Sequence, residues 1–239
     1  MRGCLFTLLL GVIAIALVVT VGIPAVAAGA LTAGIRSAGL QADDLTVNVI
    51  SEPPTDLLGL KADRVRVRAT HATFRGLGIG GMDVTLLGVS LIDRTADAVT
   101  GRLTGVTVAN VGGQPLDLAA VLLAGGGDTV TAQTTIPGAE ATTLIGDAIS
   151  TGLGVTPTSV RLVSPDRVVM RVAAQTVTAR LSVNAGGDLV AVVEGGPLAA
   201  TSTTLLHAGE DVPMRLTAVT VTPAGDLRLD GDLTIGLLG

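Results

Sequence analysis

The chain has 239 residues and a formal net charge of −5; 48% of its residues are hydrophobic, only 1% are aromatic, and it has one cysteine. An acidic chain without Trp or Tyr offers neither the basic surface nor the stacking platforms of a nucleic-acid-binding protein, and one cysteine excludes an intramolecular disulfide. The core is therefore expected to consist of aliphatic side chains, with the abundant Val and Thr favouring strands.

An uncharged apolar run, Leu5–Val21, lies near the N-terminus and predicts a signal peptide or membrane anchor over residues 1–23. Arg2 in front of it predicts a cytoplasmic N-terminus and an exported remainder. Ala25–Ala27 and Ala28–Ala30 both fit a signal-peptidase site, so a retained anchor and a cleaved signal are both open. The remainder is expected on the outer face of the cytoplasmic membrane, or secreted into a periplasm-like cell-envelope space.

The next segments predict one helix followed by strands. Pro24 to Gly39 has small residues, a proline at its start and a glycine at its end, which is typical of a helix. Strands are then expected at Leu45–Ile50, Asp63–Thr70, Met82–Leu91 and Val99–Val108. In Asp63–Thr70 the apolar Val65 and Val67 alternate with arginines, so valines and arginines are expected on opposite faces.

The pattern L-x-G-V-x-[VL] occurs at Leu86–Leu91 and at Leu103–Val108, and it returns at Leu216–Val221 with Ala218 in place of the glycine. In each copy the apolar residues change between odd and even positions at the small residue. A one-residue β-bulge produces this change and bends a strand, whereas burial of both faces would make the change uninformative. The repetition favours a strongly curved sheet.

The second half predicts helices and a β-meander. Gln114 to Ala124 predicts a helix ended by Gly125–Gly127, and Thr129–Ile136 predicts a strand. After Pro137, apolar residues at helical spacing predict a second helix, closed by Gly152; they are Ala141, Leu144, Ile145, Ala148 and Ile149. Strands are expected at Ser159–Val163, Arg167–Val172, Thr176–Val183, Leu189–Glu194, Met214–Thr222 and Leu227–Ile235, and Leu198–Leu206 fits either a strand or a helix.

These elements predict an α+β fold, in which a large curved antiparallel sheet wraps around or packs on a few helices. One exported domain is expected over residues 24–239, with 125–128 as the point where two halves would join. No nucleophile, zinc-protease, redox or phosphate-loop motif occurs, and His71 and His207 lack neighbours at metal-ligand spacing. The acidic residues Asp226, Asp230 and Asp232 are typical of hairpin turns. The sequence thus predicts a protein that is not an enzyme and has no metal or cofactor.

Two further features allow alternative interpretations. Arg64, Arg66 and Arg68 suit anionic phosphates, but an ordinary solvated sheet face paired with neighbouring acids fits them as well. The segment Phe74–Gly81 contains the only aromatic residue outside the N-terminal run. It is expected to be a flexible loop that either packs on the domain, enters a membrane or gates a cavity.

The order of elements resembles a known family. An export segment, a helix and a strand precede LLGLKADRVRVRAT, and then come MDVTLLGVSL, VTGRLTGVTV and a terminal MRLTAVTVTPAGDLRLDGDLTI. This arrangement, from about Pro24 to Ile235, resembles the LmeA-like phospholipid-binding family of actinobacterial cell-envelope proteins. The resemblance implies an exported, tubular lipid-binding-like fold in which curved sheet wraps a long helix, and it supplies no catalytic residue. The chain departs from the family in lacking a Phe-rich segment near Pro53–Leu60.

The resemblance and the apolar patterns predict a phospholipid-binding protein that holds acyl chains in an aliphatic groove and supports envelope lipid or lipoglycan assembly. The predicted lining is Val65, Val67, Val84, Leu86, Leu103, Leu144, Ile145 and Ile149, each of which also fits plain core. The predicted headgroup contacts are Arg64, Arg66 and Arg68. The expected partners are phospholipid and the membrane surface, and not nucleic acid. The alternative is a structural or assembly module that binds a protein partner without lipid.

Overall fold

The computed structural model describes residues 23–37, 39–74, 77–90, 92–93, 95–111, 114–127, 129–195, 199–208 and 214–234, leaving out a few side chains within these ranges. The apolar run Leu5–Val21, on which the predicted anchor depends, lies outside the described residues. Among the helices of the described ranges, none is both long and apolar enough to cross a membrane.

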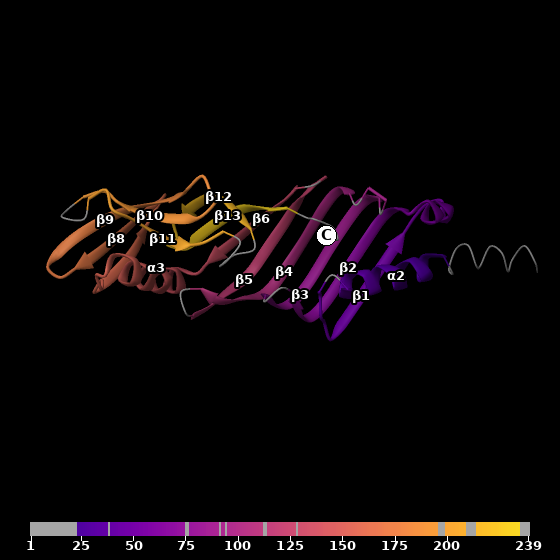
Figure 1. Ribbon diagram of the computed structural model, residues 1–239, viewed down its shortest axis with the longest axis horizontal. Helices are drawn as coiled ribbons and strands as arrows, with labels where there is room; N and C mark the ends of the chain where they lie inside the picture. The colour runs from indigo at the N-terminus through magenta and orange to yellow at the C-terminus, as the bar shows by residue number, and fades with distance from the viewer. Residues whose placement is uncertain are drawn as a thin grey trace, which may run out of the picture.

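The molecule is elongated and contains two antiparallel sheets, each with one α-helix (Figure 1). The helices are α2 (Ile23–Ser37) and α3 (Gly138–Leu153), with the short 3₁₀-helix η2 (Pro54–Gly59). The eight-stranded sheet has, in spatial order, β1 (Asp44–Ile50), β2 (Lys61–Phe74), β3 (Leu77–Ser90), β4 (Thr95–Val111), β5 (Gln114–Gly126), β6 (Thr129–Ile136), β13 (Leu227–Thr234) and β12 (Arg215–Val221). The five-stranded sheet has β11 (Ser202–Leu206), β10 (Leu189–Val193), β9 (Gln175–Val183), β8 (Arg167–Val172) and β7 (Ser159–Val163).

The large antiparallel sheet with few helices confirms the predicted β-rich fold, and the separate five-stranded sheet was not predicted. After β6 the chain forms α3 and strands β7 to β11, and it then returns to the large sheet, where β13 pairs with β6. The predicted junction at 125–128 falls at the β5–β6 hairpin, in which Gly126 pairs with Thr129. The large sheet therefore continues across that point.

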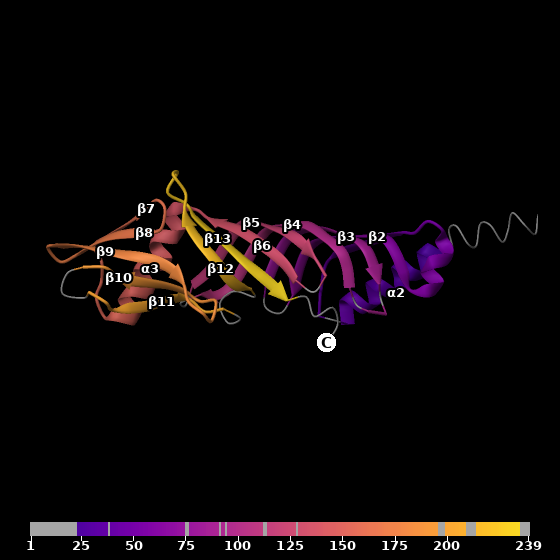
Figure 2. The same ribbon diagram turned by 90° about the horizontal axis from the view of Figure 1, so that it is seen from above.

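The strands of the large sheet are strongly curved, and α2 lies on their inner side (Figure 2). At two places in the large sheet, one residue on each of several neighbouring strands is left out of the regular strand pairing. We call each row of such residues a line. The His71 line contains His71, Gly80, Gly105 and Ala119, and the Gly88 line contains Asp63, Gly88 and Asp97. At each line the buried positions change parity, for example from Ala69 to Ala72 on β2. Positive φ angles at His71 (45°), Gly88 (56°) and Gly105 (55°) allow these local turns of the backbone.

The predicted parity changes at Gly88 and Gly105 are confirmed, but the predicted one-residue bulge is wrong for these two strands. Register is the same on both sides of each line, because neighbouring strands change parity together. An interior strand is bonded on both edges, so it keeps register only if its partners bend with it. In the third copy, on edge strand β12, register slips by one residue between Leu216 and Ala218, so a true bulge lies there.

The predicted helix from Gln114 to Ala124 is wrong, because this segment is strand β5, paired with β4 and β6. Its inward residues are Leu116 and Leu118 before the His71 line, and Val121 and Leu123 after it. A strand that changes parity once places apolar residues at spacings of two and three, which resemble the spacings of a helix. The expected loop Phe74–Gly81 is also largely strand, because β2 and β3 pair up to Phe74 and Leu77.

Three clusters of apolar side chains form the interior. The largest lies where α3 and the five-stranded sheet meet strands β4, β5, β6, β12 and β13 of the large sheet, and it buries Ala141, Ile145 and Ile149 of the predicted helical stripe. The two smaller clusters lie on the inner face of the large sheet beside α2, mainly on β1 to β4, and one of them extends to Val130 on β6. The side chain of Asp226, in the β12–β13 turn, accepts a hydrogen bond from Gly138 N (3.0 Å) and thereby caps the start of α3.

Candidate functional site

Helix α2 covers only one margin of the inner face of the large sheet. It contacts mainly β1 and η2. Ala27, Ala28, Leu31 and Ile35 face the sheet, and the hydroxyl of Thr32 donates a hydrogen bond to the carbonyl of Ala28 (2.8 Å). Alanine side chains bury little apolar surface, so α2 is held by a thinner contact than a leucine-rich helix would be.

Beyond α2, the inner face continues as apolar surface that is only partly buried. We call this surface the inner strip, and it consists of Met82, Val84 and Leu86 on β3, Leu103 on β4 and Leu123 on β5. These positions lie in adjacent rows, since Met82 pairs with Leu103. Leu103 and Leu123 each touch the largest core cluster as well as a cluster beside α2. The inner strip therefore joins the two ends of the interior without being sealed from solvent.

The structure divides the eight predicted lining residues between two places. Val84, Leu86 and Leu103 belong to the inner strip, and Val65 and Val67 lie buried in the cluster against α2. Leu144, Ile145 and Ile149 belong to the other end of the molecule, on α3. Ile145 and Ile149 are at most 1% exposed, so they act as core in this conformation.

Sequence reasoning missed Met82 and Leu123 as members of the inner strip. The sequence predicts a helix at Leu123, and a helix gives no information about partners on neighbouring strands. Met82 is the first residue of the strand predicted at Met82–Leu91. It is separated from Val84 and Leu86 by two and four residues, and this spacing places all three side chains on the same face.

The three predicted headgroup arginines lie on the outer face of β2, opposite the valines. Nε and Nη2 of Arg66 donate hydrogen bonds to both oxygens of Asp83 on β3 (2.8 and 2.6 Å), and Nε of Arg68 approaches the same carboxylate at 3.3 Å. The hydrogen bond from Arg66 holds the pKa of Asp83 below its usual range, and the same contact raises the pKa of Arg66. Because one sheet layer separates the faces, a ligand on the inner strip does not reach Arg66 or Arg68.

A depression of about 370 Å³ opens on this outer face, beside the His71 line. Its polar lining comes from two rows of paired residues, Thr46–Arg68–Asp83–Arg102 and Asp44–Thr70–Gly81–Thr104. Two arginines face two aspartates here, so the depression carries little net charge.

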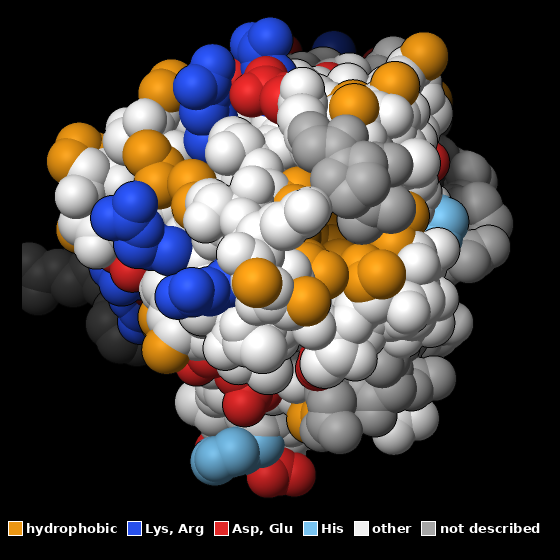
Figure 3. Space-filling model, turned by 90° about the vertical axis from the view of Figure 1, so that its left-hand side faces the viewer, with side chains coloured by type: hydrophobic (Ala, Val, Ile, Leu, Met, Phe, Trp, Pro, Cys, Tyr) orange, Lys and Arg blue, Asp and Glu red, His pale blue; other side chains and the backbone are white. Residues whose placement is uncertain are grey.

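Apolar side chains also gather in a hollow at the opposite end of the molecule, the end formed by the five-stranded sheet (Figure 3). Leu144, Leu153 and Val155, in and after α3, are among the partly buried residues that pack on the core there. Partly exposed apolar surface is therefore present at both ends of the interior.

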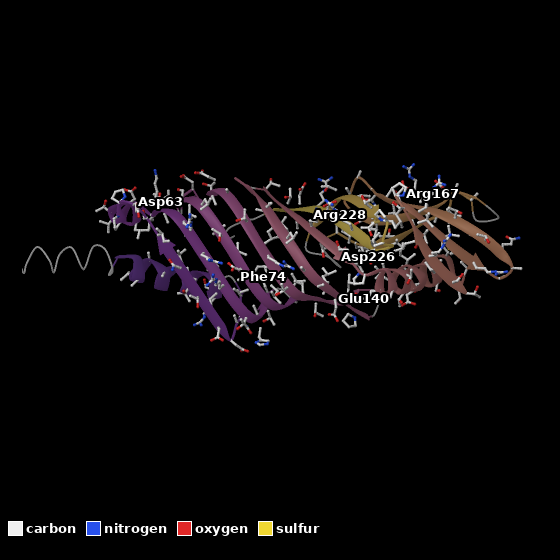
Figure 4. All side chains as sticks on the ribbon, turned by 180° about the vertical axis from the view of Figure 1, so that it is seen from behind. Asp63, Phe74, Glu140, Arg167, Asp226 and Arg228 are labelled. Atoms are coloured by element: carbon white, nitrogen blue, oxygen red, sulfur yellow. The ribbon has the colours of Figure 1, made fainter. Side chains whose placement is uncertain are left out.

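The remaining polar candidates have structural roles. Asp226 caps α3, and Asp230 accepts hydrogen bonds from Gln133 and Arg228; Asp226, Arg228 and Glu140 are labelled in Figure 4. His71 and His207 lie 3.6 and 4.0 Å from Asp43 and Asp188, respectively. In the described ranges, no group of three or more His, Cys, Asp or Glu is placed to hold a metal ion.

No protein-family model, no curated protein and no solved structure matches this chain. The functional argument therefore depends on the geometry of the two faces of the large sheet.

Proposed function

We propose that this protein is a non-enzymatic phospholipid-binding protein of the cell envelope, held on the outer side of the cytoplasmic membrane. Acyl chains lie along the inner strip, in the curve of the large sheet beside α2. The observation that carries this proposal is the partial exposure of five apolar side chains on the inner face of a curved sheet. Water contact with such a surface is unfavourable, and each methylene removed from water there contributes about 0.8 kcal/mol.

The chemistry of the inner strip suits an acyl chain rather than a polar ligand. All five side chains are aliphatic or thioether, and methionine adapts its shape to irregular apolar ligands. The alanine-rich α2 is the element that an entering chain would displace most easily, because it contacts mainly β1 and η2. The resemblance of the sequence to the LmeA-like family, with its tubular lipid-binding-like fold, supports the same proposal.

The test is photo-crosslinking of the full chain in phosphatidylcholine vesicles that contain a phosphatidylcholine with a diazirine in its acyl chain. Peptide mapping should place cross-links on the segments that contain Leu103 and Leu123. Leu103→Gln should reduce this labelling about tenfold, since burying an amide against an acyl chain costs on the order of 1–3 kcal/mol. Leu122→Gln is the matched control, because Leu122 is 46% exposed on the outer face of the neighbouring strand.

Cross-links confined to the N-terminal residues 1–22, or labelling of β4 that Leu103→Gln leaves unchanged, would refute lipid binding on the inner strip. Thermal denaturation of each variant checks that the fold is retained.

A second candidate function is that of an envelope assembly module that binds a protein partner without lipid. The depression on the outer face favours it, because Arg68 and Asp83 form an ion pair at its accessible lining, with 3.3 Å between Nε and the carboxylate oxygen. A stoichiometric protein partner lost on Arg102→Ala, together with an unlabelled inner strip, would support this function and exclude the first.

A further inference from the structure

The exposed large hydrophobic side chains of the described residues concentrate at one corner of the large sheet. Six of these side chains form what we call the η2 corner: Val26, Ile50, Leu58, Leu60, Leu87 and Ile92. Three of them are largely in solvent, with Val26 74%, Leu58 72% and Ile92 65% exposed. Leu122, in the middle of the outer face, is the other such residue in the described ranges. Large apolar groups clustered in this way mark a surface that binds something.

The register of the strands explains why these residues meet. Ile50 and Leu87 are both paired with Arg64, so they flank it on the outer face. Lys61 pairs with Ser90, which places Leu60 and Ile92 at the same edge of the sheet. Asp63, labelled in Figure 4, lies close to this edge. Helix α2, which carries Val26 in its first turns, contacts η2 from the inner side of the sheet, so Val26 extends the corner around the sheet edge.

The corner is held firmly by its own hydrogen bonds. Leu57 is buried and anchors η2 to the core, while the next residue, Leu58, points outward. The amide of Glu52 donates a 2.6 Å hydrogen bond to the carboxylate of Asp63, and the amide of Leu60 bonds back to the last turn of η2. The exposed Leu58 and Leu60 therefore lie on a turn that hydrogen bonds hold in place.

The sequence before α2 indicates what covers this corner. The uncharged run Leu5–Val21 ends two residues before Ile23, where α2 begins. Two residues span at most about 7 Å, so an anchor formed by that run would hold the start of α2, and with it η2, at the membrane surface. Tethering at this distance gives an effective concentration in the millimolar range, so even weak insertion of a few side chains is favoured.

We propose that the η2 corner inserts into the outer leaflet of the membrane and orients the domain on it. The inference rests on the proposed membrane location, and it is independent of lipid binding on the inner strip. The corner has acidic neighbours in Glu52, Asp56 and Asp93 as well as basic ones in Lys61 and Arg64. Insertion is therefore driven by apolar burial, and it requires no anionic lipid.

The test uses the full chain with Cys4→Ser and a single new cysteine at Leu58, Ile92 or Leu122, labelled with nitrobenzoxadiazole. In phosphatidylcholine vesicles, the labels at Leu58→Cys and Ile92→Cys should shift to the blue and be quenched several-fold by a doxyl lipid. The label at Leu122→Cys, an exposed leucine away from the corner, should show water-like emission and little quenching. Adding phosphatidylglycerol or salt should not change this difference.

Labels at Leu58→Cys and Ile92→Cys that are as accessible to water as the one at Leu122→Cys would overturn the proposal. Shielding without quenching by the doxyl lipid would also overturn it, because it would indicate that protein covers the corner. If cross-linking on the inner strip fails while the corner is quenched, lipid binding is refuted and the orientation stands. If the inner strip is cross-linked while the labels at the corner are not quenched, the proposed orientation is refuted and lipid binding on the inner strip stands.

Discussion

Replacing Gly152 with alanine is expected to destabilise the protein, although alanine favours helices. Gly152 lies in the last turn of α3, against β11. A Cβ placed there would overlap the hydroxyl oxygen of Thr203 and lie 3.1 Å from the Thr203 Cβ. Thr203 is buried, so its Cβ has little room to move. Overpacking costs about 1–3 kcal/mol, and the gain in helix propensity returns about 1 kcal/mol. We therefore expect a net loss of up to about 2 kcal/mol.

Gly146→Ala, six residues earlier in the same helix, is the matched control. Its added Cβ would lie 3.6 Å from Val160 Cγ2 and 3.9 Å from Pro157 Cγ, which are ordinary contacts. This variant should gain about 1 kcal/mol from helix propensity alone. Thermal denaturation of the full chain in detergent, followed by circular dichroism, measures both changes, at about 2–4 °C for each kcal/mol.

The double variant Gly152→Ala, Thr203→Ala removes the overlapping hydroxyl and should recover part of the lost stability. If Gly152→Ala raises Tm as much as Gly146→Ala does, the close seating of α3 on β11 is wrong.

Two further predictions concern the candidate site. Ile145→Ala should lower the free energy of unfolding by about 2–5 kcal/mol in urea titrations, because Ile145 is fully buried. Leu144→Ala, on the partly exposed side of α3, should lower it less. Equal losses would contradict the assignment of Ile145 to the core. The pKa of Asp83 is lowered in the folded state by the hydrogen bond from Arg66, so its contribution to stability is present at neutral pH and is lost as the pH falls below about 4. The Tm difference between wild type and Asp83→Asn should therefore be small, because both partners are about half-exposed, and should shrink on acidification; a difference that does not change with pH would refute this role.

Local patterns determined most elements of this fold. The helices α2 and α3 follow from a proline at the start, a glycine near the end and, in α3, apolar residues at helical spacing. The predicted closing residue of α3, Gly152, lies within the last turn, and Gly154 with a φ of 64° caps the helix instead. Strict alternation in β2 also determined that Val65 and Val67 face away from Arg66 and Arg68. Such features depend on neighbours a few residues apart, which the sequence displays directly.

Tertiary pairing decided the nature of β5 and of the bends. The spacing of Leu116, Leu118 and Val121 becomes intelligible only when the His71 line is seen to cross four strands in register. The parity changes themselves were visible in the sequence. A bend in an edge strand can shift the register by one residue, whereas a bend in an interior strand keeps the register because both neighbouring strands bend with it. The sequence of one segment does not show how many neighbours its strand has.

Exposure of the candidate surfaces was likewise decided by the tertiary structure. Leu86 and Ile145 are equally apolar in the sequence, yet the first is partly open on the inner strip and the second is fully buried. Leu57 and Leu58 are identical neighbours, and only the packing of η2 on α2 and β2 makes one an anchor and the other solvent-facing. Sequence determined which residues are apolar and, in regularly alternating strands such as β2, which face each residue takes. Burial depends on what packs over that face, because distant segments supply the cover.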